Sequence, residues 1–372
     1  MISERRPLVI LGATGTVGRQ ALEILRKAGS PLEVAALSAH RRSEALEGLA
    51  EGCPGARTYL TCREEERGRL LEDLLNGDYA VCLNAVVGAA GLPYSEAVLA
   101  AGCTLALANK ESLVMAGGLL TGLAARTGGR IVPVDSEHSA IHQCLTGRRP
   151  EDVRQLFLTA SGGALRDLPL EDFSGVTPQQ ALAHPNWEMG PRITIDSATM
   201  MNKAFEIMEA WHLFDVEAER IRVLLHRQSV VHSMAEFVDG SILAQVGPPD
   251  MAFPIHYALH HPERVPSPLQ GFQPELFRKL TFEVPDPRRY PALALGWEAA
   301  RRGGAAGAVL NAADEVAVEA FLDGGISFPE IAALCRETLE AMPALPSAKL
   351  DEIHAADAWG RRHARGLCTA PR

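Results

Sequence analysis

The chain has 372 residues, 47% of them hydrophobic, and its 36 lysines and arginines face 46 aspartates and glutamates, for a formal net charge of −10. This length exceeds one compact core, so two or three globular domains are expected. The acidic balance argues against nucleic acid or an anionic membrane as the main partner, because either would favour a basic face. None of the seven cysteines forms a CxxC pair, so neither a disulfide framework nor a zinc knuckle is indicated, and a reducing compartment fits best.

The beginning of the chain carries no targeting or membrane pattern. The apolar run that starts at Leu8 is interrupted at once by Gly12, unlike a signal peptide. The longest apolar stretch is broken by Asn84, Pro93 and several glycines, and it stays short of the ~18 uncharged residues of a membrane span. We therefore expect a soluble, cytoplasmic protein.

Short apolar runs alternate with helical patterns up to residue 134, which is typical of βαβ units and a parallel sheet. The sequence predicts strands at residues 8–11, 32–37, 79–84 and 104–108. The segment GATGTVG lies between the first strand and a helix expected at 19–28, where backbone must approach a pyrophosphate closely. Its GxxGxxG spacing is looser than GxGxxG, and a plain tight connection is the alternative, but the placement favours a dinucleotide site.

The second strand is followed by SAHRRS, which bears on the choice of cofactor. NAD-specific enzymes usually place an acid at this strand end for the ribose hydroxyls. Here Arg41 and Arg42 suit a 2′-phosphate instead, and no acid follows until Glu44. A solvated basic helix start is the alternative, but the pattern favours NADP(H).

A strand expected at 130–134 leads into DSEHSAIH. In an extended segment Asp135 and Glu137 would point to the same side and could hold Mg²⁺ or Mn²⁺. The same residues also suit a helix N-cap with an acid in the first turn, and neither interpretation excludes the other. His138 and His142 have a spacing that could bind zinc, but the HExxH order is lacking, so packing or capping is more typical of them.

The segment DSATMMNKAFE, residues 196–206, brings a hydroxyl, an amide, an ammonium and a carboxylate together. On one helix Asn202, Lys203 and Glu206 would crowd a single face. Ser197 is expected at the helix start, where unpaired N–H groups and the helix dipole favour an anion. An ordinary capped helix with a surface Lys–Glu pair is the alternative.

Two irregular segments flank this helix pattern. A strand at 156–158 runs into TASGGAL, where Ser161 and the following glycine N–H groups could hold phosphate, although a plain glycine turn would look the same. Prolines and glycine forbid regular structure in HPNWEMGPR, residues 184–192. Such a segment is typical of an active-site lid, or of a loop that merely buries Trp187.

These patterns predict an α/β protein with a Rossmann-type parallel sheet domain, a central α/β catalytic domain and a C-terminal helical domain. Residues 227–234 alternate like a strand, the proline-rich segment that follows lacks periodicity, and the pattern from Ala292 onward is helical. The expected ranges are 1–134 for nucleotide binding, 135–261 for catalysis, 262–291 for a linker and 292–372 for the helical domain.

The chain resembles the 1-deoxy-D-xylulose 5-phosphate reductoisomerase family over nearly its whole length. The motifs that carry the resemblance stand in the family's order: GATGTVG, ALANKESL, PVDSEHSAI, TASGG, HPNWEMG, DSATMMNKAFE, QSVVHSM and LNAADEVAV.

The resemblance implies roles for particular residues. The metal carboxylates would be Asp135, Glu137 and Glu206. The substrate would be bound by Ser136, Ser161, His184, Trp187, Ser197, Asn202 and Lys203, and Lys110 would join the metal carboxylates and His184 among the catalytic residues. The cofactor would be bound by Gly12, Thr14, Gly15, Thr16, Val17, Arg41, Arg42, Asn109, Glu111 and Met189. His40 departs from the glycine common in the family, which leaves the 2′-phosphate contacts open.

The resemblance also implies the reaction. An NADPH- and metal-dependent enzyme would rearrange 1-deoxy-D-xylulose 5-phosphate and reduce the resulting aldehyde to 2-C-methyl-D-erythritol 4-phosphate, on the non-mevalonate route to isoprenoids. Mg²⁺, Mn²⁺ and Co²⁺ all suit such an oxygen site. A homodimer is expected. The expected ligand is a small phosphorylated sugar.

Two other functions compete with this one. A semialdehyde dehydrogenase shares the glycine-rich turn but needs a nucleophilic cysteine, and Cys144 follows no nucleophile motif. A non-catalytic NADP(H) sensor would keep the nucleotide-binding fold without chemistry, but it would have no use for Asp135, Glu137 and Glu206.

Overall fold

A computed structural model describes residues 6–187 and 189–369 of the chain. Its contacts group the residues into two compact units. The first contains residues 1–112, 120–142 and 250–271, and the second contains residues 113–119, 143–249 and 272–372. These units differ from the expected ranges, because 250–271 group with the N-terminal sheet and the C-terminal helices group with the second sheet. The functional division into four ranges stays a prediction.

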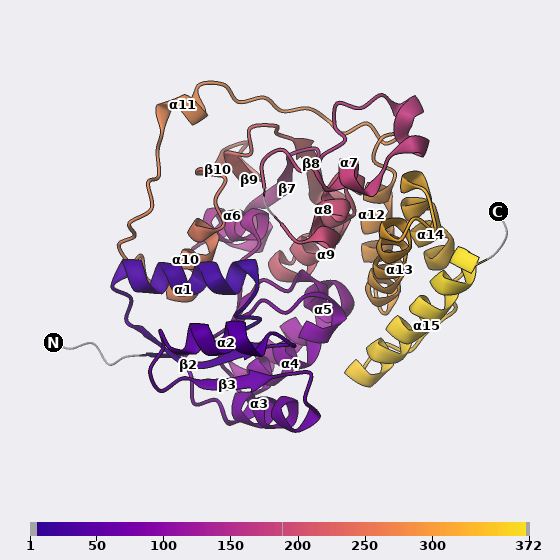
Figure 1. Ribbon diagram of the computed structural model, residues 1–372. Coiled ribbons are helices and arrows are strands. Elements are labelled where there is room, and N and C mark those ends of the chain that lie inside the picture. Colours follow the sequence, from indigo (N-terminus) through magenta and orange to yellow (C-terminus); the bar gives the residue numbers. More distant parts are fainter. Residues whose placement is uncertain (1–5, 188, 370–372) are drawn as a thin grey trace. The chain divides into compact units, whose positions relative to one another are not determined.

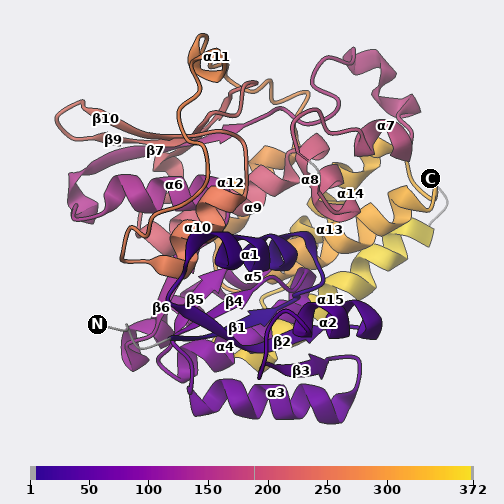
Figure 2. The ribbon, with the colours of Figure 1, turned by 60° about the vertical axis from the view of Figure 1, so that its left-hand side comes forward.

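The first unit is built on a six-stranded parallel sheet with the order β3-β2-β1-β4-β5-β6. Helices α3 and α4 lie on one face of this sheet and α1 and α10 on the other (Figure 2). The strands are Arg6–Leu11 (β1), Leu32–Ala39 (β2), Arg57–Leu60 (β3), Val81–Asn84 (β4), Thr104–Leu107 (β5) and Arg130–Pro133 (β6). The helices are Thr16–Ala28 (α1), Ser43–Ala50 (α2), Glu64–Asn76 (α3), Leu92–Ala100 (α4) and Ala252–His260 (α10).

The core of this sheet explains why its strands could be read from the sequence. Strands covered on both faces are nearly continuous apolar runs, and the buried residues here include Leu8, Ile10, Leu37, Leu83 and Val132. The Rossmann-type fold is confirmed, and so are the five strands expected in this part, apart from their end residues. Strand β3 was missed, because it is a short edge strand whose first two residues are exposed.

Two helices continue from the first unit into the second. Helix α5 is Lys110–Thr127, and its residues 113–119 group with the second unit. Its backbone departs from helical geometry at Ala116, with φ −138° and ψ 27°. Helix α6 is Ser136–Leu145, and its last three residues belong to the second unit.

The second unit contains a four-stranded mixed sheet with the order β10-β9-β7-β8 (Figure 1). Its strands are Val153–Ala160 (β7), Ile221–Leu225 (β8), Val231–Phe237 (β9) and Ile242–Val246 (β10). The strand expected at 156–158 is confirmed as part of β7. The strand expected at 227–234 begins only at Val231, because residues 226–229 form a turn in which Ser229 has φ 54°.

The helices of the second unit form a common apolar core that includes Phe205, Leu310, Phe321 and Ile331. Figure 1 shows α13, α14 and α15 side by side at the C-terminal end. The helices are Pro178–Leu182 (α7), Pro191–Thr199 (α8), Met201–Phe214 (α9), Pro274–Phe277 (α11), Ala292–Arg302 (α12), Ala306–Leu322 (α13), Phe328–Glu340 (α14) and Leu350–Thr369 (α15). The all-helical C-terminal part expected from Ala292 onward is confirmed for the residues up to 369.

Residues 262–291 contain little regular structure, as expected of this proline-rich segment. Apart from α11, the chain here makes an isolated antiparallel bridge between Leu225 and Glu283. Within residues 6–187 and 189–369, no helix is both long enough and apolar enough to cross a bilayer.

Candidate active site

The glycine-rich turn of the first unit connects β1 to α1 as expected. Gly12 has φ 75°, and a Cβ atom there would lie 2.6 Å from the carbonyl oxygen of Ala85. A Cβ on Gly18 would lie 2.6 Å from the carbonyl oxygen of Gly12, so the turn can tighten onto α1 only with glycine at both positions. Gly15 and Thr16 are exposed at the start of the helix, where backbone N–H groups favour an anion.

The two arginines expected to read a 2′-phosphate follow the end of β2. Arg41 and Arg42 are both exposed, at the start of α2. The side chain of the preceding His40 contacts Thr61, with its Nδ1 3.3 Å from the Thr61 Oγ1. Both guanidinium groups are therefore available to a ligand at the carboxyl edge of the sheet.

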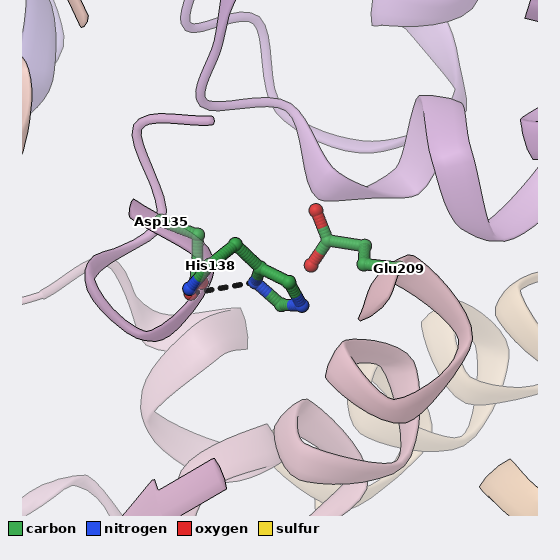
Figure 3. A group of neighbouring side chains, drawn as sticks. All are labelled: Asp135, His138 and Glu209. Atoms are coloured by element: carbon green, nitrogen blue, oxygen red, sulfur yellow. Dashed lines mark hydrogen bonds and ion pairs between the residues drawn. The ribbon is translucent and has the colours of Figure 1, made fainter. Parts of the chain in front are cut away.

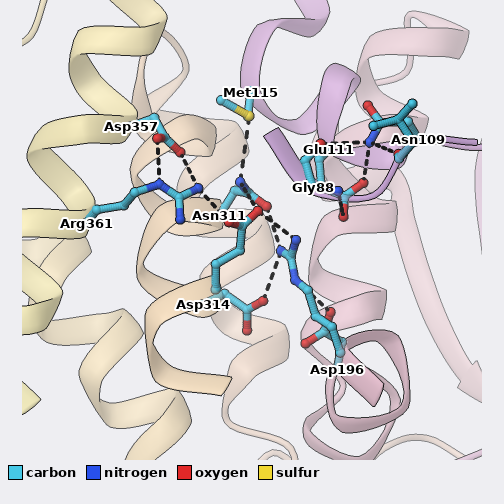
Figure 4. A network of polar contacts seen from close by, with 12 residues as sticks. Gly88, Asn109, Glu111, Met115, Asp196, Asn311, Asp314, Asp357 and Arg361 are labelled. Atoms are coloured by element: carbon cyan, nitrogen blue, oxygen red, sulfur yellow. Dashed lines mark hydrogen bonds and ion pairs between the residues drawn. The ribbon is translucent and has the colours of Figure 1, made fainter. Parts of the chain in front are cut away.

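Asn109 and Glu111 were expected among the cofactor residues, and the structure gives them internal partners. Asn109 caps α5 and donates from Nδ2 to the carbonyl oxygens of Val86 and Gly88, at 2.7 and 2.9 Å (Figure 4). Glu111 accepts from the Asn109 amide and from the backbone N–H of Gly88. Both side chains are buried, so they hold the loop after β4 against the start of α5.

Lys110 and Asp135 meet at the carboxyl ends of two neighbouring strands. Residues Leu107 of β5 and Pro133 of β6 are paired, so the segments that follow them emerge together. Lys110 Nζ lies 2.7 Å from Asp135 Oδ2, and each side chain is only about a tenth exposed. The carboxyl edge of a parallel sheet is where such folds place their ligands.

The other oxygen of Asp135 caps helix α6. Asp135 Oδ1 accepts from the backbone N–H groups of Glu137 and His138, at 3.1 and 3.4 Å, and lies 2.9 Å from His138 Nδ1 (Figure 3). The expectation of an extended segment at Asp135 and Glu137 is wrong, because β6 ends at Pro133 and the helix starts at Ser136. The alternative of an N-cap with an acid in the first turn is correct. Figure 3 also draws Glu209, a buried acid of α9.

The remaining polar residues of this helix are internally bonded. Ser136 Oγ donates to Glu137 Oε2 at 2.6 Å. His142 Nδ1 lies 2.7 Å from the hydroxyl of Tyr257, and burial lowers the pKa of His142 to about 4. His138 and His142 therefore have the capping and packing contacts that were expected of them.

In the second unit, the turn after β7 carries Ser161. Gly162 and Gly163 both have positive φ, and a Cβ on Gly163 would lie 2.6 Å from the carbonyl oxygen of Ser197. The Gly163 N–H donates to Ser161 Oγ at 3.2 Å. The close approach places the Ser161 turn directly against the end of helix α8.

His184 contacts the same turn in a defined protonation state. Its Nδ1 accepts from the backbone N–H groups of Asn186 and Trp187, at 3.1 and 2.9 Å, so its proton is on Nε2. Nε2 therefore donates to Ser161 Oγ at 3.0 Å. Burial, and secondarily the charge of Arg166, lower the pKa of His184 to about 4, which keeps the ring neutral near pH 7.

The DSATMMNKAFE segment is two helices rather than one. Helix α8 ends at Thr199, Met200 has φ 65°, and α9 starts at Met201. Ser197 therefore lies in the last turn of α8, and the expectation that it starts a helix is wrong. The reason is that Pro191 and Gly190 begin α8 earlier, while Thr199 Oγ1 accepts from the N–H of Met201 and starts the next helix.

The expected crowding of Asn202, Lys203 and Glu206 on one face of α9 is confirmed. Asn202 Nδ2 donates to Glu206 Oε1, and Lys203 Nζ donates to Glu206 Oε2, both at 2.6 Å. Lys203 also donates to the carbonyl oxygen of Thr159 at 2.7 Å. Lys203 and Glu206 are almost fully buried, so the surface-pair alternative is wrong.

The sequence reasoning missed two arginines of this unit. Arg166 donates from Nη1 to the carbonyl oxygen of Ser161 at 2.9 Å, and its position shortly after the two glycines could have suggested it. Arg192 follows the 184–190 segment and contacts acids of α13. Trp187 and Met189 are half-buried in that segment, and Glu188 lies outside the described residues.

Comparison with known proteins gives concordant matches along the chain. Family models match at residues 8–80 and 67–117 (1-deoxy-D-xylulose 5-phosphate reductoisomerase), 131–214 (its C-terminal domain) and 246–363 (DXP reductoisomerase C-terminal domain). The reductoisomerase of Anaeromyxobacter dehalogenans is 46% identical and covers 96% of both chains. The Zymomonas mobilis enzyme, solved with NADPH, superposes with a TM-score of 0.90 at 38% identity, covering 98% of this chain and 100% of the other. A DOX-P reductoisomerase with NADPH, fosmidomycin and magnesium gives 0.89 at 36% identity and 98% coverage of both.

Proposed function

This chain belongs to the 1-deoxy-D-xylulose 5-phosphate reductoisomerase family, and we propose that Asp135, Glu137 and Glu206 hold its metal ion. The protein is an NADPH- and divalent-metal-dependent oxidoreductase that converts 1-deoxy-D-xylulose 5-phosphate to 2-C-methyl-D-erythritol 4-phosphate in isoprenoid biosynthesis. The observation that carries the residue assignment is the low exposure of two of these carboxylates and their contacts with lysines. Asp135 is about a tenth exposed and Glu206 is fully buried, and each accepts a hydrogen bond from a lysine ammonium.

The donor set fits a hard divalent cation. The proposed donors are carboxylate oxygens, which Mg²⁺ and Mn²⁺ prefer. Asp135 is oriented by the α6 N–H groups and His138, and Glu206 by Asn202 and Lys203, and such neighbours fix the orientation of metal ligands. When bound, the ion acts as a Lewis acid that stabilises negative charge on substrate oxygens. Lys110 and Ser136 lie beside Asp135 and Glu137, where we assign them to the polar oxygens of the substrate.

The phosphate group is assigned to the second unit. Ser161, Ser197, Asn202 and Lys203 supply hydroxyl, amide and ammonium donors, and the Ser161 turn lies against α8. Neutral His184 would contribute a hydrogen bond from Nε2 rather than a full charge. Arg166, close to the same turn, adds a positive potential that favours the dianion.

Residues 184–190 are proposed to cover the bound substrate. The first half of the segment is fixed by His184 and by Asn186, whose Nδ2 donates to the carbonyl oxygen of Arg227 and to Ser229 Oγ. Trp187 follows directly and is half-buried. A large aromatic side chain at this place would exclude water from the reacting carbons.

The cofactor is assigned to the first unit and supplies the hydride. Gly12, Thr14, Gly15, Thr16 and Val17 would line its pyrophosphate, with Asn109 and Glu111 supporting the neighbouring loop. Met189 is assigned to the nicotinamide. Arg41 and Arg42 are assigned to the 2′-phosphate.

We expect the double variant Arg41→Ala, Arg42→Ala to weaken NADPH much more than NADH. Each guanidinium would make charge-assisted hydrogen bonds to the 2′-phosphate worth about 1.5–3 kcal/mol, so the ratio of kcat/KM for the two cofactors should change by roughly 10-fold or more. Steady-state kinetics with both cofactors measures the ratio, and Arg57→Ala, another exposed arginine of the same unit, is the control. An equal loss for both cofactors would show that other residues recognise the 2′-phosphate.

The proposed function is tested by following NADPH absorbance with 1-deoxy-D-xylulose 5-phosphate and Mg²⁺ or Mn²⁺, with and without a chelator. We expect oxidation that stops on metal removal and returns when the ion is added back. Binding of NADPH without any oxidation would support the sensor alternative. The dehydrogenase alternative is disfavoured because Cys144 is buried and burial raises the pKa of its thiol to about 11, which opposes a thiolate nucleophile.

A homodimer is also proposed. Strand β10 ends the second sheet, and its Ile242, Leu243 and Val246 are exposed. An exposed apolar edge strand is a template for pairing with another chain, and a second copy would cover it. Sedimentation velocity should give twice the chain mass of 40.0 kDa, and a monomer at micromolar concentration would contradict the proposal. The cytoplasmic location stays a prediction.

A further inference from the structure

Arg192 lies in the first turn of α8, two residues after the proposed lid ends at Gly190. Its guanidinium donates from Nη1 to Glu315 Oε1 at 2.7 Å and from Nη2 to Asn311 Oδ1 at 2.7 Å. Nη2 also lies 3.3 Å from Asp314 Oδ2, and Nε lies 3.7 Å from Asp196 Oδ2. The guanidinium therefore joins the start of α8 to a single turn of α13 through several contacts.

The cluster continues to two further elements of the same unit. Arg361 of α15 pairs with Glu315 at 2.6 Å and with Asp357 at 2.7 Å (Figure 4). Asn311 Nδ2 lies 3.7 Å from the sulfur of Met115 in α5. Helix α13, to which Arg192 binds, is thus held to α15 and α5 by further polar contacts. It therefore gives the start of α8 a fixed attachment.

The electrostatics of the cluster favour retention of the Arg192 cation. A cation in the first turn of a helix opposes the helix dipole, so Arg192 depends on the acids around it. Those acids, Asp196, Asp314, Glu315 and Asp357, outnumber the two arginines. Burial raises the pKa of Asp314 to about 6, and the neighbouring Arg192 opposes this rise.

We propose that Arg192 is a positioning residue for the sugar phosphate, because it anchors the C-terminal end of the 184–190 segment to α13. The other end of the segment is held by His184 and Asn186, as described above. Trp187 and Met189 lie between these two anchors, so the anchors set where these two side chains meet the substrate. This inference rests on the proposed function, in which Trp187 covers the substrate.

The anchor predicts a specific kinetic signature. If Arg192 is lost, the segment gains freedom, and its ordering must be provided by substrate binding energy. The KM for 1-deoxy-D-xylulose 5-phosphate should rise, because His184 and Trp187 are its proposed contacts in this segment. The KM for NADPH should rise less, because Met189 is the one proposed cofactor contact in this segment and the others lie in the first unit, away from Arg192. A purely structural role would instead lower thermal stability without separating the two KM values.

The experiment compares Arg192→Met, Arg192→Lys and the control Arg302→Met in the full-length protein. Arg302 is an exposed arginine of the same unit that pairs with Glu298 and donates to the carbonyl oxygen of Leu339, far along the chain from the lid. Misplacement of a positioned group by about 1 Å can cost roughly 100-fold, so we expect Arg192→Met to raise the sugar-phosphate KM by about 10- to 100-fold. Arg192→Lys should recover part of this loss, since it keeps the charge but not the bidentate fork.

A second readout is independent of turnover. Acrylamide quenching of Trp187 fluorescence, obtained as the difference from matched Trp187→Phe proteins, reports the exposure of the lid without substrate. We expect Arg192→Met to increase quenching of Trp187 and Arg302→Met to leave it unchanged. If the unaltered protein failed to oxidise NADPH, the proposed function would fall, while the quenching comparison would still test the anchor. Unchanged quenching together with an unchanged sugar-phosphate KM, or equal effects in both methionine variants, would overturn the proposal.

Discussion

Replacing Asp135 with asparagine, or Glu206 with glutamine, is expected to reduce turnover severely at saturating NADPH. Both changes keep the size of the side chain but remove the negative charge that a divalent ion requires. Outer partners of metal ligands already change affinity or activity by about 10- to 100-fold, so a ligand should cost more than ~100-fold. The rate is measured by NADPH oxidation over a range of Mg²⁺ or Mn²⁺ concentrations, because a weakened site should also need more metal.

Two controls sharpen this prediction. Glu298→Gln removes another helical glutamate of the second unit, one that pairs with Arg301 and Arg302, and should leave the metal dependence unchanged. NADPH binding, followed by cofactor fluorescence, should remain in both ligand variants because the nucleotide turn is unaltered. Near-normal turnover in either Asp135→Asn or Glu206→Gln would refute the shared metal assignment.

Replacing Lys203 with methionine is expected to damage both stability and activity. The ammonium is buried and donates to Glu206 and to the carbonyl oxygen of Thr159. Removal of one partner leaves the Glu206 carboxylate buried without its neighbouring cation, which costs about 3–5 kcal/mol of unfolding free energy. Urea denaturation measures this loss, and the KM for the sugar phosphate should rise because a proposed phosphate contact is gone.

The double variant Lys203→Met, Glu206→Gln separates the two effects. Without the carboxylate, the methionine no longer faces an uncompensated charge, so we expect a large part of the lost stability to return. Activity should stay low, because both the proposed phosphate contact and a metal ligand are missing. Additive losses of stability in the double variant would mean that Lys203 and Glu206 do not interact as the structure has them.

Much of the first unit was readable from the sequence for a simple reason. Its central strands are buried on both faces, so Leu8 to Leu11 and the runs after it stand out as short apolar segments between turns. The glycine-rich turn is also local, because positive φ at Gly12 and close backbone approach at Gly18 both require glycine. Edge strands such as β3 and β10 carry exposed residues and lack this signal.

The site was predicted in part. The crowding of Asn202, Lys203 and Glu206 follows from helical spacing alone, and the structure confirms it. The helix boundaries were harder to predict from the sequence. The break at Met200 depends on the Thr199 hydroxyl, which accepts a hydrogen bond from the backbone N–H of Met201. That competition between side-chain and backbone hydrogen bonds leaves little trace in a pattern of apolar residues.

The sequence by itself determined the family, the parallel sheet, the cofactor and the kinds of side chain available to the metal and the phosphate, because these depend on local motifs and spacing. Tertiary structure decided what each group is bonded to. It placed Asp135 at the cap of α6 with Lys110 on its other oxygen, and it fixed the proton of His184 on Nε2. It also brought Arg192 to Asn311 and Glu315, which lie more than a hundred residues away in the chain. Such contacts arise only when distant segments pack together, because the burial that strengthens them exists only in the folded protein.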